Sequence, residues 1–360
     1  MRTNRLLAIG VIAGVVLAGG AYGASAAKTN VATARHTGAA FRVALLNPGT
    51  KNDGSWGQAV DQGALNGAKA VGAQASLVDL LETPAQYQQQ GAAYAKKGYD
   101  LVIVANGSDP QVVTALAKQF PKTWFCEVAA TIANPPKNVC TINLTYYDGD
   151  FLAGALAGMV SKTGHVGEIG GYSFPQLNWE MNGFALGARY VNPNIKISSA
   201  YVNTWTDVGV TRSAAQAQIA AGADVIFSAT DQATQGIYAA AQAKGNTYAI
   251  SQYFDTHSQA PSVVLTSVVF GLPQAIANVI KLAKSGQLKN TNYLMNYQQG
   301  SARLAPFYGL APKVVTPAIQ KRLKAIEAMI VSGKLKVPAL AAEKAGETYP
   351  LSKLPPAPKA

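Results

Sequence analysis

Polar and aromatic side chains follow several apolar segments of this 360-residue chain. In the first half, the candidates for contact with a ligand are Asp53 and Trp56, after Phe41 to Leu46, and Asn106 and Ser108, after Asp100 to Ala105. Carboxylate, amide and hydroxyl groups hydrogen-bond a ligand, and an indole stacks on a flat ring. These residue types favour reversible binding of a small molecule.

The second half repeats this arrangement. Its candidates lie after apolar segments or near the start of the helix that follows: Trp179, Trp205, Thr230, Asp231, Tyr253 and Asp255. In an open α/β sheet, ligands bind beyond the carboxyl ends of the strands, where all of these residues are expected. Two alternatives remain open: Asp53 can cap a helix, and Trp56 can pack against the protein.

The segments that must position these residues alternate between continuous aliphatic strands and helices. Examples are the strand Ala223 to Ala229, the helix 233–244 and the strand Tyr248 to Ser251. Strands that are apolar on both faces and alternate with helices are typical of a parallel sheet covered on both sides. Because the chain is too long for one core, we predict an α/β protein with two doubly wound, Rossmann-like lobes.

The chain crosses between these lobes near Asp148 to Gly171. Gly154, Ala157 and Gly158 leave one helix face nearly bare, which allows a close approach to other backbone. We expect a first lobe of 38–147 plus 266–300, with the strand Val263 to Val269 returning the chain to it. The second lobe would comprise 148–265 plus 301–338, and a flexible tail 339–360. Repeated crossings predict a multi-strand hinge.

The N-terminal segment has the pattern of a secretory signal. Arg2 and Arg5 precede an apolar run, and Ala24-Ser25-Ala26 suits a signal peptidase. We therefore predict a signal peptide over 1–26 and an exported protein, on the periplasmic or extracellular side of a bacterial envelope. The residue directly after the cleavage site is not a cysteine, so we expect no lipid anchor.

Two cysteines remain after export, Cys126 and Cys140, in neighbouring strand-like segments. In an oxidising compartment, a disulfide between them is the natural pairing, and two buried thiols are the alternative. Neither arrangement supports a metal site, because no histidine is close in sequence and two cysteines are an incomplete ligand set.

The basic charge does not indicate nucleic-acid binding. The net charge of the full chain is +12, and loss of Arg2 and Arg5 lowers it to +10. The one dense basic run, Lys321 to Lys324, has the spacing of a solvated helix face, and charged residues make up only 13% of the chain.

The crossover and the run Asn182 to Arg189, followed by Asn192-Pro193, closely resemble the basic-membrane-protein (BMP) family of PnrA-like ABC-transporter solute-binding proteins. The resemblance covers about Phe41 to Pro338. It implies a type I periplasmic-binding fold that closes over a purine base or nucleoside and delivers it to an ABC permease. A monomer without cofactor or covalent chemistry is implied.

The resemblance also implies roles for individual residues. Asp53 and Trp56 match a motif whose acid hydrogen-bonds the ligand and whose aromatic ring stacks on a purine, although Gly57 replaces its usual Asn. Trp205 would hold the opposite ring face, and Thr230-Asp231 and Asp255 resemble the family's ligand-binding carboxylates. Phe270-Gly271 stands where many members have Lys, which leaves room for a free base or another flat heterocycle such as a flavin.

An enzyme is the main competing class. The chain has no Gly-x-Ser-x-Gly elbow, no His-Glu-x-x-His and no phosphate-binding P-loop. His257 with Asp255 is the one candidate acid–base pair. The alternatives to a transport protein are therefore an exported nucleoside hydrolase and a ligand-sensing receptor domain.

Overall fold

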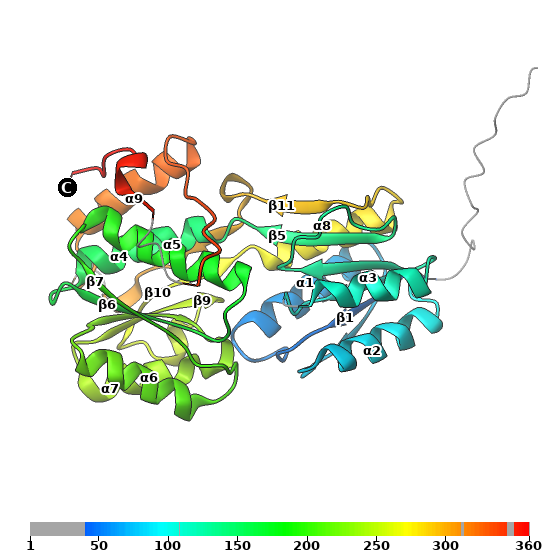
Figure 1. Ribbon diagram of the computed structural model, residues 1–360, viewed down its shortest axis with the longest axis horizontal. Coiled ribbons are helices and arrows are strands. Elements are labelled where there is room, and N and C mark those ends of the chain that lie inside the picture. The colour runs from blue at the N-terminus through cyan, green and yellow to red at the C-terminus, as the bar shows by residue number, and fades with distance from the viewer. Residues whose placement is uncertain (1–39, 108, 311–312, 344–348, 360) are drawn as a thin grey trace, which may run out of the picture. The chain divides into compact units, whose positions relative to one another are not determined.

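The computed structural model describes residues 40–107, 109–310, 313–343 and 349–359 (Figure 1). The predicted signal peptide lies outside these ranges, as does Ser108. Within them, no helix has both the length and the apolar character needed to cross a membrane.

The first lobe is built on a parallel six-stranded sheet with the order β11-β5-β4-β3-β1-β2. Its strands are β1 (Arg42–Leu46), β2 (Gln74–Val78), β3 (Leu101–Val104), β4 (Trp124–Val128), β5 (Val139–Leu144) and β11 (Asn292–Met295). Helices cover both faces: α1 (Trp56–Ala70) and α8 (Leu272–Lys284) on one, α2 (Pro84–Lys96) and α3 (Pro110–Gln119) on the other.

Alternate residues of β1 show how these two faces are filled. Val43 and Leu45 pack with α1 and α8, whereas Ala44 and Leu46 pack with α2 and α3, and all four are fully buried. A strand that is apolar on both sides is thereby buried on both sides, as its sequence predicts.

The second lobe has a sheet of the order β12-β10-β9-β8-β6-β7, in which only β12 is antiparallel to its neighbour. Its strands are β6 (His165–Gly170), β7 (Lys196–Tyr201), β8 (Val225–Ala229), β9 (Tyr248–Tyr253), β10 (Val264–Phe270) and β12 (Ala302–Leu304). The helices α4 (Tyr147–Val160), α5 (Pro175–Val191) and α9 (Pro317–Val331) lie on one side, with α6 (Val208–Ala220) and α7 (Gln235–Lys244) on the other (Figure 1). The predicted α/β architecture of two doubly wound lobes is confirmed.

One strand joins a different sheet from the one predicted. β10 pairs in parallel with β9 and antiparallel with β12, so the chain returns to the first lobe only after Phe270, through α8. The aliphatic composition of this segment identifies a buried strand but carries no information on which sheet it extends. Within the described residues, three connections thus cross between the lobes: β5 to α4, β10 to α8 and β11 to β12.

The small-residue face of the crossover helix packs against α5, as its spacing predicts. A Cβ atom at Gly154 would lie 1.9 Å from the carbonyl oxygen of Phe184, and one at Gly187 would lie 1.9 Å from that of Phe151. The glycines therefore set the distance between these two helices, which pack backbone against backbone.

Cys126 and Cys140 face each other in adjacent strands β4 and β5, and their sulfur atoms form a disulfide. The two residues are fully buried. The first lobe therefore carries a covalent link between neighbouring strands, and the alternative of two thiols does not apply.

The described part of the C-terminal tail packs against the second lobe, contrary to the flexible tail predicted from composition. The Asn182 Nδ2 group donates to the carbonyls of Leu340 and Ala342, and Arg322 Nε donates to that of Pro358. Leu354 is buried in the core. These bonds depend on partners in α5 and α9, which composition cannot reveal.

Candidate functional site

Asp53 organises the loop between β1 and α1. Its carboxylate accepts backbone N–H bonds from Thr50 at 3.0 Å, Ser55 at 2.8 Å and Gln58 at 3.0 Å. Because Gln58 lies in the first turn of α1, this carboxylate serves the helix end as a cap. The structure thus gives Asp53 the structural role that its sequence position left open, and its contact with a ligand stays a prediction.

Trp56, the first residue of α1, connects the two lobes. Its indole Nε1–H donates to the carbonyl of Ala105 at the end of β3, at 2.8 Å, and its ring meets Tyr253 edge-on at 5.7 Å. Its backbone N–H donates to Asp231 Oδ1 at 3.3 Å. Trp56 therefore lies where strand ends of both lobes meet.

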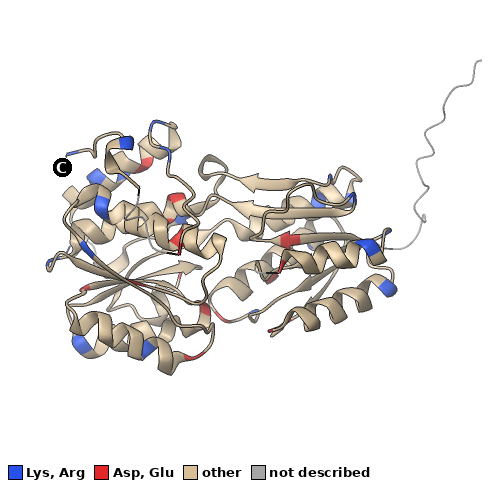
Figure 2. Cartoon of the chain, in the orientation of Figure 1, with Lys and Arg blue, Asp and Glu red and all other residues tan. Residues whose placement is uncertain are grey.

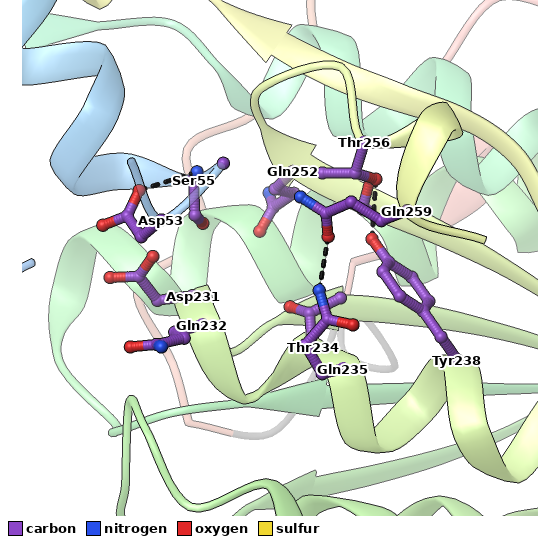
Figure 3. Close-up of a pocket in the computed structure, with 12 residues that line it drawn as sticks. Asp53, Ser55, Asp231, Gln232, Thr234, Gln235, Tyr238, Gln252, Thr256 and Gln259 are labelled. Atoms are coloured by element: carbon purple, nitrogen blue, oxygen red, sulfur yellow. Dashed lines mark hydrogen bonds between the residues drawn. The ribbon is translucent and has the colours of Figure 1, made fainter. Parts of the chain in front are cut away.

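Asp231 lies just after β8 in the second lobe, with only 7% of its surface exposed. Its backbone is left-handed, with φ of 53°. Burial, followed by the charge of Asp53, raises the pKa of its carboxyl to about 7. The two carboxyl groups lie next to each other in Figure 3, one from each lobe. Asp231 therefore keeps its proton to a higher pH than an exposed aspartic acid does.

The neighbouring Thr230 holds the turn that carries Asp231. Its hydroxyl forms hydrogen bonds with Ser228 Oγ at 2.9 Å and Thr234 Oγ1 at 3.2 Å, and all three side chains are buried. Because these hydroxyl groups bond to one another, Thr230 supports the site from within the second lobe.

Behind the strand ends lies a cluster of buried polar side chains that we name the acid cluster: Asp150, Glu180, Gln252 and Tyr253. Gln252 Nε2 donates to Asp150 Oδ1 at 2.7 Å, and the Tyr253 hydroxyl donates to Glu180 Oε2 at 3.1 Å. Burial raises the pKa of both carboxyls well above its usual range, and the charges of Glu180 and Asp148 raise the pKa of Asp150 further. Asp150 Oδ2 and Gln252 Oε1 have no hydrogen-bond partner within the described residues.

Only Tyr253 of this cluster was a candidate from the sequence. The other members are far apart along the chain and meet because α4 packs closely on α5 and the end of β9 bonds to an acid of each helix. The available signal was Asp150 in the glycine-rich crossover and Glu180 in a helix of mostly apolar residues, since an acid in such a setting requires a buried partner.

A small polar cavity lies where the lobes meet (Figure 3). Its first-lobe wall is Asp53, Gly54 and Ser55, and its second-lobe wall comprises Asp231, Gln232, Thr234, Gln235, Tyr238, Ser251, Gln252, Thr256 and Gln259. Its volume of about 10 Å³ accommodates about one water molecule. None of these lining residues is Lys or Arg. Figure 2 shows many of the basic residues on outer helices and strand ends.

The three candidate tryptophans do not line this cavity. Trp205 packs against Gly171, where an added Cβ would lie 2.2 Å from its ring, and contacts Tyr172 at 5.3 Å and Phe174 at 6.4 Å. Trp179 contacts Tyr146 at 6.4 Å and Tyr147 at 6.0 Å. Trp56 and Trp205 therefore have different aromatic neighbours, and their opposed stacking on a ligand stays a prediction.

The remaining candidates make local contacts. Asn106 Nδ2 donates to Asp109 Oδ2 at 3.3 Å, and Ser108 lies outside the described residues. Asp255 accepts the hydroxyl of Tyr308 and, at 3.2 Å, the backbone N–H of His257. The His257 ring stacks on Tyr308 at 4.0 Å. The Asp255 carboxylate thus bonds the His257 backbone, which gives the proposed acid–base pair no support.

Metal binding is not indicated at this site. Within the described ranges, no group of three or more His, Cys, Asp or Glu side chains is arranged to hold a metal ion.

Known proteins with similar sequences and folds agree with this architecture. A purine-binding protein of Brucella abortus is 28% identical over 304 residues, which cover 84% of each chain. Basic membrane protein A of Borreliella burgdorferi is 25% identical over 307 residues, 83% of this chain and 88% of the relative. A solute-binding protein of an ABC transporter system from Aeropyrum pernix superposes with a TM-score of 0.72 at 17% identity, covering 83% of this chain and 94% of that one. A corresponding protein from Conexibacter woesei gives 0.67 at 22%, covering 83% and 99%.

These structural likenesses confirm the fold as that of periplasmic solute-binding proteins. A family model described as "ABC transporter substrate-binding protein PnrA-like" matches residues 40–341, nearly all of the described chain. The protein therefore belongs to the Bmp family of PnrA-like ABC transporter substrate-binding proteins, as its crossover sequence predicts.

Proposed function

We propose that this protein captures a purine base or nucleoside between its two lobes and delivers it to the permease of an ABC importer. Membership of the family implies a small-molecule ligand, a permease partner and a place outside the cytoplasm. That the ligand is a purine goes beyond what family membership implies. The observation that carries it is the meeting of Trp56, Tyr253 and Asp231 at the strand ends of both lobes.

The chemistry of these groups suits a purine. A flat ring with N–H donors can stack on an indole while a buried carboxyl accepts its hydrogen bonds. Asp231 supplies such a carboxyl, and Asp53 lies beside it. The name of the Brucella abortus relative, a purine-binding protein, points to the same class of ligand.

The charge of the site favours a base or nucleoside over a nucleotide. Two carboxyl groups and no Lys or Arg line the cavity, so a phosphate group would meet repulsion without a compensating cation. A nucleoside monophosphate is therefore the matched negative control, which should not bind, for any purine base or nucleoside that does bind.

Binding requires the lobes to separate. A cavity of about 10 Å³ is far smaller than a purine ring, and the bond from the Trp56 backbone N–H to Asp231 joins the two lobes. Ligand entry must break this bond, and the three crossing connections form the hinge about which the lobes turn.

Isothermal titration calorimetry of the mature protein against adenine, guanine, hypoxanthine, adenosine, guanosine and inosine tests the proposal. We expect heat with at least one, and none with adenosine monophosphate. Riboflavin tests the alternative of another flat heterocycle. Absence of heat with all six purines would remove this ligand class and leave the fold unchanged.

A variant pair ties the ligand to the site. Asp231→Asn should weaken purine binding at least tenfold, because the buried acceptor becomes partly a donor. Glu82→Gln, which removes an exposed acid, is the matched control and should leave affinity unchanged.

Chromatography of the recovered ligand distinguishes a carrier, which returns the ligand intact, from a hydrolase, which releases a free base. Light scattering tests the expected monomer.

A further inference from the structure

A second and larger cavity lies in the second lobe, outside the site between the lobes. It has a volume of about 320 Å³ and is bounded by α4, β12, the segment that follows β12, and α9. This volume is within the range of small-molecule sites in proteins, about 300–1,000 Å³. The ligand proposed above does not use it, because the two cavities share no lining residue.

The floor of this cavity is apolar. Leu152 of α4 and Leu323 of α9 are buried, and Leu304 and Phe307 are half-buried beside them. A hydrocarbon group placed here would bury part of its apolar surface against these side chains, which is favourable.

Two cations stand at the exposed edge of this floor. Arg303 and Lys324 both line the cavity and are exposed. Within the described residues, neither side chain forms a hydrogen bond or an ion pair, although the charge of Arg303 acts on Tyr308, whose hydroxyl donates to Asp255. Their positive charge therefore remains available to an anion.

One acid also lines the cavity, but it has a partner. Glu327 Oε1 accepts the hydroxyl of Tyr297 at 2.7 Å, and Tyr297 lies in the connection between β11 and β12. Burial and this bond raise the pKa of Tyr297, so it stays protonated and keeps donating to Glu327. The lining thus holds two cations and one acid and carries one net positive charge.

We propose that this cavity is a second ligand site, which binds a small amphipathic carboxylate. The hydrocarbon part of such a molecule would lie on Leu152, Leu304 and Leu323, and its carboxylate would lie between Arg303 and Lys324. A neutral molecule of the same shape would gain only the apolar contact, and an amine would meet a lining with a net positive charge.

Calorimetric titration with sodium octanoate tests this inference, with octylamine and octanol as probes of equal chain length. We expect octanoate to bind the mature protein at least tenfold more tightly than either. The double variant Arg303→Gln/Lys324→Gln should weaken octanoate binding at least tenfold, because both groups that face the carboxylate lose their charge. Both positions are exposed, so the variant should fold.

The matched control is Lys321→Gln/Lys336→Gln, which lowers the net charge equally at exposed positions that do not line the cavity. This control should retain octanoate binding. Equal weakening by the two double variants would reduce the effect to general charge and overturn the proposal. Octanol binding as tightly as octanoate would equally remove the carboxylate role.

The location is tested separately. In the mature protein labelled at leucine methyl groups, octanoate should shift the signals of Leu152 and Leu323, assigned through Leu→Val variants. Shifts confined to other leucines would overturn the assignment to this cavity, as would displacement of octanoate by a purine that occupies the site between the lobes.

Discussion

The two lobes present their carboxyl groups to the shared site in different states. In the first lobe, the Asp53 carboxylate accepts three backbone N–H bonds from its own loop and from α1. In the second lobe, burial raises the pKa of Asp231, Asp150 and Glu180. At the strand ends, Asp53 of the first lobe is thus held by backbone N–H groups, whereas the buried Asp231 of the second lobe keeps its proton to a higher pH than usual.

The origin of this difference is the packing of the helices behind each site. The N-terminus of α1 supplies N–H groups and a positive dipole end to Asp53. The acid cluster is instead enclosed beside α4 and α5, whose glycines let the two backbones meet without room for water. The acid cluster is therefore buried where this helix pair packs closely, and the first lobe buries acids of its own at Asp61 and Glu127.

The largest effect is expected from breaking that helix pair. Gly154→Ala places a Cβ 1.9 Å from the Phe184 carbonyl oxygen, and a backbone atom cannot move aside as a side chain can. We expect a loss of about 4 kcal/mol in the free energy of unfolding, measured by chemical denaturation.

Two further glycine-to-alanine variants provide comparison values for this loss of stability. Gly67→Ala in α1 of the first lobe meets the Ala277 Cα atom at 2.7 Å and should cost less, about 2 kcal/mol. Gly309→Ala has no other atom within 4 Å of the added Cβ and should be nearly neutral. Equal losses for Gly154→Ala and Gly309→Ala would contradict the role given to the helix pair.

The next effect concerns the first lobe alone, which carries the disulfide. Replacing both Cys126 and Cys140 by Ala should lower the free energy of unfolding by about 3 kcal/mol, because the open chain gains the entropy of a loop of roughly 15 residues. Urea denaturation measures this loss. A reductant should destabilise the unaltered protein and leave the double variant unchanged; a reductant effect on both would point to another cause.

Much of this fold follows from local patterns in the sequence. Continuous aliphatic segments such as Leu101 to Val104 identify buried parallel strands, and the bare face at Gly154 identifies a close helix contact. The pairing of Cys126 with Cys140 follows from their places in neighbouring strands. In each case the feature depends on a contact with a residue near in sequence or with the backbone alone.

The features that sequence reasoning missed depend on distant partners. β11 and β12 have only four and three residues and form by pairing with β5 and β10, so their own composition carries little signal. The acid cluster requires α4, α5 and β9 to meet. Trp56 and Trp205 could be placed at strand ends, but the direction of each ring depends on neighbours such as Tyr253 and Tyr172.

The contrast between the lobes can be sharpened at these two tryptophans. Trp56→Ala should weaken purine binding by about 5- to 150-fold, the equivalent of about 1–3 kcal/mol for one stacked base. Trp205→Ala should have an effect of the same size if its ring covers the opposite face. Calorimetry measures both, with Trp124→Phe at the amino end of β4 as the control.

The two variants have separate meanings. An unaltered affinity in Trp205→Ala alone would reject the opposed stacking and leave the ligand on the first-lobe ring. An unaltered affinity in both would remove aromatic stacking from the proposed function.

The smallest effect concerns the proton on Asp231. Its pKa is about 7 in the folded protein, above the usual value of 3.8, so folding favours the protonated form. The corresponding stability is fully present below pH 3.8 and is lost as the pH rises through 7. Between about pH 5.5 and 8 we expect a fall on the order of 1–2 kcal/mol from this group. Asp231→Asn, which cannot ionise, should lose less stability over this interval than the unaltered protein, whereas Glu82→Gln should follow the unaltered protein. Thermal melting across the interval measures the difference. Equal slopes of stability against pH for Asp231→Asn and the unaltered protein would mean that Asp231 is already ionised beside Asp53. That result would remove the contrast between the two lobes at this site.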